Sequence, residues 1–412
     1  MPNIDPARLL GDLRRLADFG RYKTGVHRPT YSTEDMAARQ WLVDRMGEAG
    51  LAATIDGIGT VIGRSASAGP RLLIGSHLET QPYAGWLDGA MGVIYGLEVA
   101  RAFRDSQDCR NLAIDVGAWA DEEGHYGSML GSRSFCGVLP EQEIDQLSNK
   151  MTGKTLRDAL AEAGLAGRKR EVLPDGRYLG YLEAHVEQGA TLDTSGQRLG
   201  IVTGIVGIYG YRFTAIGQQN HAGTTRMAAR KDAGVALMRL WHDIDQRFAE
   251  VTGPHSVWTA GRMVLDPGAP SVIPGKAELL FQFRDIARER LAIMDKALLE
   301  LVAAADARGP CRIETEVTAR TEPRAMDPAL QQALERAAEA RAPGLHTKLQ
   351  SGAGHDAQIF AQRLPAGMLF VPSIAGISHH YAEDTKEDDI VLGCQVLADA
   401  AASILRGRAG SA

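Results

Sequence analysis

The chain has 412 residues, of which 44% are hydrophobic and 23% are charged. This length exceeds what one ordinary hydrophobic core supports, so we expect a globular protein of two domains. The formal net charge of -6 and the lack of a Lys/Arg cluster exclude the electrostatic signature of a nucleic-acid-binding protein. Four scattered cysteines without Cys-x-x-Cys spacing predict reduced thiols in a cytoplasmic protein.

The first residues predict a helix rather than a targeting signal. Asp5-Pro6 is typical of an N-cap followed by proline at the first helical position. No basic stretch precedes an apolar run, so we expect no signal peptide. No stretch reaches the roughly 20 apolar residues of a membrane span. We therefore expect no association with a membrane.

The first half of the chain alternates strand and helix patterns. Residues 71–75 and 112–119 are short apolar runs, typical of buried strands in a largely parallel sheet. Between them, residues 91–100 have helical periodicity after Asp88-Gly89. This alternation predicts an α/β fold.

The pattern changes near residue 205. The segments that alternate like strands are 205–216, 257–265 and 276–284, and those with helical periodicity are 232–249 and 287–307. Such an order predicts a compact α+β unit with an open-faced sheet. We interpret the chain as an α/β catalytic domain with a mixed, largely parallel sheet, formed by residues 1–207 and 323–412. A smaller α+β lid or dimerisation domain, residues 208–322, would interrupt it.

Six side chains of metal-ligand type lie in short motifs that contain or adjoin glycine. They are His77, Asp88, Glu122, Glu123, His185 and His379. Imidazoles and carboxylates suit zinc or a neighbouring divalent metal, and two ions need about five or six protein groups. In the Glu122-Glu123 pair, one carboxylate can bind metal while the other stays free as a base, as metal-assisted hydrolysis requires. Each residue alone has an ordinary alternative; Asp88, for example, could cap a helix. Their conjunction favours the metal site.

Three further segments have alternative interpretations. Asn220 and His221, among small residues, could donate hydrogen bonds to a developing oxyanion, or Asn220 could merely shape a turn. Arg284 could bind a substrate carboxylate in bidentate fashion or form a surface ion pair. The glycine-rich segment 351–357, which contains Gly354 and His355, lacks the Gly-Lys-[Ser/Thr] ending of a phosphate loop, so we expect no nucleotide there.

From residue 19 to Asp389 the chain resembles the amidase/carbamoylase branch of the di-zinc aminoacylase–carboxypeptidase superfamily. This branch contains N-carbamoyl-L-amino-acid hydrolases, β-ureidopropionases and allantoate amidohydrolases. The motifs that carry the resemblance are Gly-Val-His-Arg-Pro-Thr-Tyr-Ser-Thr-Glu-Asp (25–35), His-Val-Glu-Gln-Gly, Asn-His-Ala-Gly-Thr-Thr, Ser-Gly-Ala-Gly-His-Asp-Ala and Gly-Ile-Ser-His.

The resemblance implies two divalent metal ions per subunit, bridged by Asp88. His77 and His185 would complete one site, and Glu123 and His379 the other. Zinc is the expected metal, and manganese, cobalt and nickel suit the same ligands. Glu122 would be the general base.

The resemblance also implies how a small substrate is bound. Arg284 would grip its carboxylate, and His221 would act on it from the inserted domain, in the same chain or across a homodimer formed by that domain. The other expected substrate-binding residues are Gln188, Asn220, Ser271, Gly354 and His355.

Four residues depart from the family pattern. Glu79 replaces an aspartate that steers the metal-bound histidine, so the placement of the ring has to accommodate one more methylene. Ser271 replaces an asparagine and shortens a substrate contact, while Trp86 adds apolar bulk and Arg226 adds charge. These changes predict an altered choice of substrate with the core chemistry retained.

The sequence thus predicts hydrolysis of a linear amide or ureido C–N bond in a small carboxylate substrate, with an N-carbamoyl-L-amino acid as the first candidate. An N-acyl-amino-acid hydrolase is the alternative, favoured if Trp86 lines an acyl pocket. A catalytically silent binding or dimerisation module is a third interpretation. Its signature would be the loss of Glu122 or of a ligand, and all of these residues are present.

Overall fold

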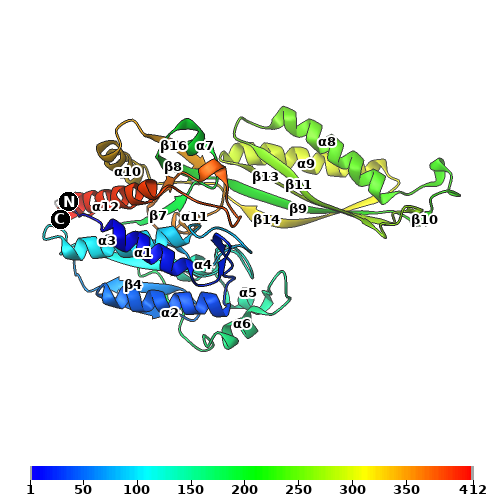
Figure 1. Ribbon diagram of the computed structural model, residues 1–412. Helices are drawn as coiled ribbons and strands as arrows, with labels where there is room; N and C mark the ends of the chain where they lie inside the picture. The colour runs from blue at the N-terminus through cyan, green and yellow to red at the C-terminus, as the bar shows by residue number, and fades with distance from the viewer. Residues whose placement is uncertain (1, 410–412) are drawn as a thin grey trace. The chain divides into compact units, whose positions relative to one another are not determined.

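A computed structural model describes residues 2–409. The chain forms two compact units (Figure 1). Unit 1 comprises Met1–Thr203 and Ala325–Ala412, and unit 2 is Gly204–Arg324. The domain boundaries expected from the sequence, 208 and 322, lie just inside the ends of unit 2.

Unit 1 is built on a mixed sheet that has nine strands within residues 2–409. Their order is β15-β8-β17-β7-β5-β6-β4-β3, with β16 paired to β8. The central strands β17, β7, β5 and β6 are parallel, whereas β8, β4 and β3 pair in antiparallel fashion. This arrangement confirms the expected mixed α/β fold. The strands are β3 (Leu51–Ile55), β4 (Val61–Ser65), β5 (Arg71–His77), β6 (Ala113–Trp119), β7 (Tyr181–Val186), β8 (Leu199–Ile205), β15 (Arg324–Ala325), β16 (His346–Ser351) and β17 (Ala366–Val371).

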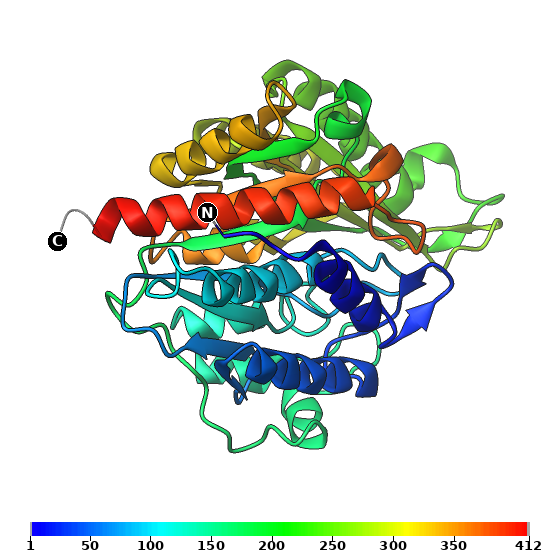
Figure 2. The same cartoon turned by 60° about the vertical axis from the view of Figure 1, so that its left-hand side comes forward.

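Helices pack against the central strands and form the core of unit 1. Helix α3 contacts β5, β6 and β7, and α12 lies between α3 and α10 (Figure 2). The short helix α4 contacts β6, and the short helix α11 contacts β7 and β17. The helices are α1 (Pro6–Ala17), α2 (Thr33–Glu48), α3 (Ala90–Asp105), α4 (Leu130–Phe135), α5 (Glu141–Gln146), α6 (Leu156–Glu162), α7 (Thr191–Ser195), α10 (Pro328–Arg341), α11 (Asp356–Phe360) and α12 (Glu387–Ala409).

Helix α12 departs from the expectation that no stretch of the chain is long and apolar enough to span a membrane. Its segment Glu387–Gly407 is the one helix within residues 2–409 that is long and apolar enough to cross a membrane by length and composition. However, 61% of the apolar window is buried, and the helix packs against α3 and α10. Its apolar residues therefore belong to the core of unit 1.

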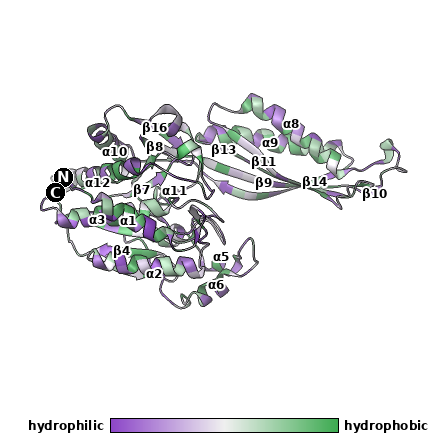
Figure 3. Cartoon of the chain, viewed as in Figure 1, coloured by the Kyte–Doolittle hydropathy of each residue, from purple (hydrophilic) through white to green (hydrophobic). Residues whose placement is uncertain are grey.

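Unit 2 is a four-stranded antiparallel sheet with the order β11-β13-β9-β14. Helices α8 and α9 cover one face of this sheet (Figure 1). Tyr209, Tyr211 and Phe213 alternate along β9 and are buried in the core with these helices, whereas Arg212 between them pairs with Glu316. Figure 3 shows hydrophilic residues along α8 and α9. The elements are β9 (Gly207–Ile216), β10 (Asn220–His221), α8 (Ala233–Val251), β11 (Val257–Asp266), β12 (Val272–Ile273), β13 (Lys276–Asp285), α9 (Arg288–Arg308) and β14 (Arg312–Thr321).

Candidate metal centre

The candidate ligands of unit 1 gather at one edge of its sheet. His77 is the last residue of β5, and His185 lies near the end of the parallel neighbour β7. Glu122 and Glu123 follow β6, which is parallel to β5 on its other side. Because the carboxyl ends of parallel strands meet at one edge, this is where open α/β sheets bind ligands. Loops before α3 and after β17 bring the remaining two residues, Asp88 and His379.

The two oxygens of the Asp88 carboxylate face different imidazole nitrogens. Its Oδ1 lies 3.1 Å from His185 Nε2 and 3.6 Å from His77 Nε2. Its Oδ2 lies 3.4 Å from His379 Nε2. The candidate ligand atoms of His77, Asp88 and His185 lie within 4.8 Å of one another, and so do those of Asp88, Glu123 and His379.

Backbone carbonyls orient the two buried imidazoles. His77 Nδ1 lies 3.0 Å from the carbonyl oxygen of Glu79, and His185 Nδ1 lies 2.9 Å from that of Val186. A carbonyl oxygen can only accept, so each Nδ1 carries a proton, and each Nε2 is the ring nitrogen that faces Asp88. Neutral imidazoles with an outer partner on Nδ1 are the usual metal-binding form. The donor set therefore fits divalent ions.

The electrostatics of the cluster reflect burial and close opposite charges. Burial alone would raise the pKa of Asp88, but His185 and His77 hold it well below its usual range. Burial raises the pKa of Glu122 well above that of an ordinary glutamate, and His77 opposes this effect only in part. Burial likewise raises the pKa of Glu123. Burial thus disfavours the charged forms of both glutamates, and bound cations would oppose this effect.

The two adjacent glutamates have different surroundings. Glu123 Oε2 accepts a hydrogen bond of 2.9 Å from Gln81 Nε2 and lies 3.9 Å from His379 Nε2. Glu122 Oε2 lies 3.7 Å from His77 Nε2. Within residues 2–409 no donor makes a hydrogen bond to the Glu122 carboxylate. One glutamate is therefore tied to the ligand group, while its neighbour keeps its oxygens available.

Strained backbone positions shape the loops that carry these side chains. Asp121, Gln188 and His379 have φ values of 55°, 58° and 53°, in the left-handed region that non-glycine residues seldom adopt. The Asp121 carboxylate accepts backbone hydrogen bonds from His125, Tyr126 and Gly127 at 2.8–3.0 Å. These bonds fold the loop back on itself and fix the Glu122-Glu123 pair at the end of β6.

Gln188, which the sequence predicts to contact substrate, lies beside two of the candidate metal ligands. Its side-chain Nε2 is 3.1 Å from Asp88 Oδ2 and 3.2 Å from His379 Nε2. Its backbone N–H donates to Ser373 Oγ at 3.1 Å. The amide is therefore within reach of any molecule that approaches these two ligands.

His355 is buried against a candidate ligand. Its ring lies 4.6 Å from that of His185, centroid to centroid, and its Nε2 is 2.8 Å from Ser351 Oγ. Burial and the nearby His185 hold its pKa well below the usual value, so the ring is neutral. A Cβ on the neighbouring Gly354 would lie 2.9 Å from Met129 Cε, which leaves little room there for a side chain. Substrate contact by these two residues stays a prediction.

Three of the site residues predicted in unit 2 lie in or beside the strand pair β10–β12. Asn220 and His221 form β10 opposite Ile273 and Val272 of β12, and Ser271, which precedes β12, accepts a backbone hydrogen bond from Ala222.

His221 Nδ1 accepts from the backbone N–H groups of Gly223 and Thr224, at 2.9 and 3.2 Å. Its proton therefore sits on Nε2, which makes the exposed ring a hydrogen-bond donor.

Arg284 projects from β13, where its guanidinium donates to Gln282 Oε1 at 3.2 Å.

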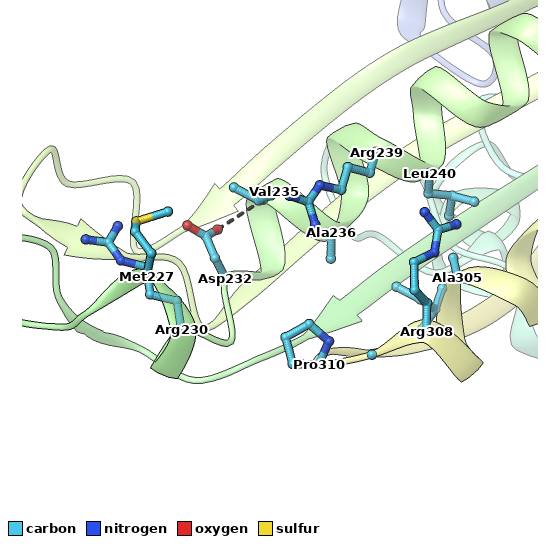
Figure 4. Close-up of a pocket in the computed structure, with 12 residues that line it drawn as sticks. Met227, Arg230, Asp232, Val235, Ala236, Arg239, Leu240, Ala305, Arg308 and Pro310 are labelled. Carbon is cyan, nitrogen blue, oxygen red and sulfur yellow. Dashed lines mark hydrogen bonds between the residues drawn. The ribbon is translucent and has the colours of Figure 1, made fainter.

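Unit 2 also contains a pocket of about 120 Å³ at the start of α8 and the end of α9 (Figure 4). None of the site residues predicted from the sequence lines it. Of its arginines, Arg230 donates to the backbone carbonyls of Ala222 and Thr225 in the His221 loop, and Arg308 pairs with Asp243 at 2.9 Å. The pocket wall thus supports the loop that presents His221.

Sequence reasoning missed Gln81 and Glu383. Glu383 is 1% exposed; its Oε1 accepts from the backbone N–H of Asp88 at 3.1 Å, and its Oε2 accepts from Ser378 Oγ at 2.8 Å. A Cβ on Gly85 would come within 2.0 Å of Glu383 Oε1, so this close approach requires glycine. The one available signal was a carboxylate four residues after His379.

Comparisons with known proteins agree with this geometry. A sequence profile of peptidase family M20/M25/M40 matches residues 73–403. The N-carbamoyl-L-amino acid amidohydrolase of Geobacillus stearothermophilus is 33% identical over 409 residues, which cover 96% of this chain and 97% of that protein. The allantoate amidohydrolase of Bacillus subtilis (strain 168) is 32% identical, with 93% and 94% covered.

Among solved structures, an amidase of the hydantoinase/carbamoylase family from Burkholderia phymatum matches with a TM-score of 0.89 and 50% identity, over 99% of both chains. These findings confirm the resemblance that the motifs indicated. The chain belongs to peptidase family M20/M25/M40, and it is an amidohydrolase that acts on C–N bonds.

Proposed function

We propose that this amidohydrolase holds two divalent metal ions and cleaves a linear ureido or amide bond in a small carboxylate substrate, first of all an N-carbamoyl-L-amino acid or a related ureido acid. The observation that carries the proposal is the Asp88 carboxylate, whose two oxygens face separate donor groups. The names of the relatives, N-carbamoyl-L-amino acid and allantoate amidohydrolases, support a ureido substrate.

In this proposal Asp88, His77 and His185 would hold one ion, and Asp88, Glu123 and His379 would hold the other. Zinc suits these nitrogen and oxygen donors, and manganese, cobalt or nickel can replace it. Bound ions of this kind polarise a carbonyl and lower the pKa of water towards neutrality.

Glu122 acts as the general base. Its carboxylate accepts a proton from the attacking water while the new C–O bond forms at the carbonyl carbon. As the C–N bond breaks, Glu122 returns that proton to the leaving nitrogen. With an N-carbamoyl amino acid, the products are the free amino acid and carbamic acid, which decomposes to ammonia and carbon dioxide.

Other residues bind and orient the substrate. Arg284 grips its carboxylate in bidentate fashion, and His221 donates its Nε2–H to the oxyanion that develops at the carbonyl. His221 acts within its own chain or across a homodimer formed through unit 2. Gln188, Asn220, Ser271, Gly354 and His355 complete the proposed set of contacts.

The alternative, an N-acyl-amino-acid hydrolase, would need an acyl pocket beside Trp86. The Trp86 side chain packs partly against the core of unit 1, and its Nε1 donates to Asp384 Oδ1 at 3.3 Å. These contacts engage the indole with the protein itself. They give the acyl pocket no support, so the ureido substrate remains the main proposal.

A substrate panel on reconstituted enzyme tests the proposal. Protein stripped with a chelator is loaded with zinc, manganese, cobalt or nickel and given N-carbamoyl, N-formyl, N-acetyl and aryl-acyl amino acids. We expect two ions per chain, and equal amounts of ammonia and free amine from N-carbamoyl substrates alone. Free amine without ammonia, released from acyl substrates, would favour the alternative. No turnover by fully loaded protein would indicate a silent module.

The matched variant is Glu122→Gln, which keeps the size of the side chain and removes the base. We expect kcat to fall by about 10²- to 10⁴-fold, the range that general acid–base catalysis supplies. Metal content, measured by atomic emission, should stay at two ions per chain because Glu122 is not a proposed ligand. Activity within tenfold of wild type with both ions bound would remove Glu122 from this role.

A further inference from the structure

Glu79 occupies the position where the resemblance places an aspartate that steers the metal-bound histidine. In this structure the Glu79 backbone performs that task, because its carbonyl oxygen lies 3.0 Å from His77 Nδ1. The Glu79 carboxylate oxygen Oε1 is 4.0 Å from the same nitrogen, which is too far for a hydrogen bond. The side chain therefore has another use.

Both carboxylate oxygens of Glu79 are engaged with other groups. Oε1 accepts a hydrogen bond of 2.6 Å from the backbone N–H of Glu122. Oε2 accepts one of 2.7 Å from Arg39 Nη2. Glu79 and Arg39 are both 0% exposed, and charge-assisted hydrogen bonds in such surroundings are short and strong. Glu79 thus ties the proposed base to a buried arginine.

Asp35 and Gly59 also hold Arg39 in place. Its Nε donates to both oxygens of Asp35 at 3.0 Å, one turn earlier in α2. Its Nη1 donates to the backbone carbonyl of Gly59 at 2.9 Å. Because the fork of a guanidinium is planar and rigid, these bonds determine where the Glu79 carboxylate can lie.

The backbone N–H of Glu122 is held by Glu79 alone among the residues described. The backbone carbonyl oxygen of Glu122 has other partners and accepts from Ser128 Oγ and from the Met129 N–H, at 3.1 and 3.3 Å. The Glu122 N–H has Glu79 Oε1 as its single acceptor within residues 2–409. An aspartate at position 79 would be shorter by one carbon–carbon bond, about 1.5 Å, and could not reach both Glu122 and Arg39.

We propose that the Glu79 side chain positions Glu122 rather than His77, and that Arg39 holds the Glu79 carboxylate in place for this role. This inference rests on the proposed role of Glu122 as the base. It explains how the chain uses a glutamate at this position: His77 keeps its orientation through the Glu79 backbone, and the longer side chain reaches the amide of the base.

Two variants separate the two roles, Glu79→Gln and Glu79→Asp. Both keep the backbone carbonyl that orients His77, so the metal dissociation constant, measured by chelator competition, should stay near that of wild type. We expect kcat to fall by about tenfold or more, since small displacements of a catalytic group can cost about 100-fold. KM should change little, because Glu79 makes no hydrogen bond to a residue proposed to bind substrate.

The matched control is Glu98→Gln. Glu98 is also 0% exposed and also accepts hydrogen bonds from a backbone N–H (Asp5, 2.7 Å) and from an arginine (Arg8, 2.7 Å), but it lies in α3 among α1 contacts. We expect this variant to lose stability and to keep both kcat and metal affinity. The comparison separates positioning from the general cost of disturbing a buried ion pair.

The opposite result would overturn the inference. If the Glu79 carboxylate steers His77, Glu79→Gln weakens metal binding by about 10- to 100-fold, as loss of an outer partner does, and fully loaded enzyme keeps its kcat. Unchanged kcat in both variants would also overturn it. Should Glu79→Gln fail to fold, Glu79→Asp still keeps a charge opposite Arg39.

A spectroscopic readout is independent of activity. In protein labelled with [15N]glutamate, the Glu122 amide resonance is identified by its loss in Glu122→Gln. A short hydrogen bond to a carboxylate moves an amide proton downfield, so we expect this resonance to shift upfield in Glu79→Gln and in Glu79→Asp. A stationary resonance would refute the contact. If wild type hydrolyses none of the substrates, the proposed function fails while this measurement still decides the role of Glu79.

Discussion

The backbone of Asp88 is held as closely as its carboxylate. Glu383 accepts a hydrogen bond from the Asp88 N–H with one oxygen and from Ser378 Oγ with the other. Ser378 directly precedes His379, so one buried carboxylate joins two loops that carry proposed metal ligands. Outer partners of this kind set the geometry that a metal encounters.

Replacing Glu383 should therefore loosen the metal centre without removing a ligand. For Glu383→Ala we expect metal affinity to fall by about 10- to 100-fold, measured by chelator competition. Glu383→Gln should lose less, because its amide oxygen can still accept from the Asp88 N–H. The surface variant Glu387→Gln serves as the control, since this side chain is 54% exposed. Wild-type affinity in Glu383→Ala would contradict the linking role.

At the residue scale, the sequence indicates the candidate metal ligands better than the residues that position them. His77, Asp88, Glu123, His185 and His379 could be picked out because imidazoles and carboxylates recur in short motifs, and the structure brings them together. Gln81 and Glu383 lie in the loops of Asp88 and His379, but they contact Glu123 and Asp88 in other loops. Arg39 comes from α2. Their roles depend on the reach of side chains across tertiary contacts, which no local pattern encodes.

Among the elements, the buried strands β5 and β6 were predictable and the exposed edge strand β14 was not. Strands β5 and β6 are short, largely apolar and buried, so composition and length identify them. Strand β14 is almost entirely exposed and carries Arg312, Glu314 and Glu316. It belongs to the sheet because it pairs with β9, a long-range contact that leaves no hydrophobic pattern of its own.

The alanine-rich part of helix α12 shows a second limit of prediction from composition. The helix extends to Ala409, and Ala398, Ala400, Ala401 and Ala402 are fully buried. Small side chains allow a helix to lie close to its neighbours, here α3 and α10. Composition alone does not reveal that contact.

The burial of α12 yields a stability prediction. Leu397 is 0% exposed in the core of unit 1. We expect Leu397→Ala to lower the free energy of unfolding by about 2–5 kcal/mol, through lost burial and the cavity that remains. Urea denaturation followed by circular dichroism measures the change. Ser403→Ala, at an exposed position of the same helix, should change it by less than about 0.5 kcal/mol. Equal effects would mean that α12 is not a core helix.

Across the whole molecule, both units shield their thiols. The four cysteines are unpaired and buried, Cys311 in unit 2 and the others in unit 1. Burial raises the pKa of Cys136 to about 12, and it raises that of Cys394 well above the usual value. Because the thiolate is the reactive form, a raised pKa keeps these groups protonated and inert at pH 8.

We therefore expect slow modification of native protein by a disulfide reagent at pH 8, followed optically. In guanidinium the same reagent should titrate four thiols at once, because unfolded cysteines have a pKa of about 8.5. Raising the pH towards 10 should speed the reaction of Cys136 and Cys394 little while the fold persists. Rapid reaction of native protein with one or more thiols would show that a cysteine is more accessible than its burial indicates.

The points where the chain passes between its units have a consequence for how such a molecule can be rearranged. Strands β8 and β15, which precede and follow unit 2, are neighbours in the sheet of unit 1. Within unit 2, Ile208 near its start lies opposite Thr321 near its end. In each unit, the two points where the chain passes to the other unit therefore lie side by side. A short turn between these two points could make either unit an independent chain. A segment with adjacent ends can be excised, transplanted or circularly permuted with little cost to its host.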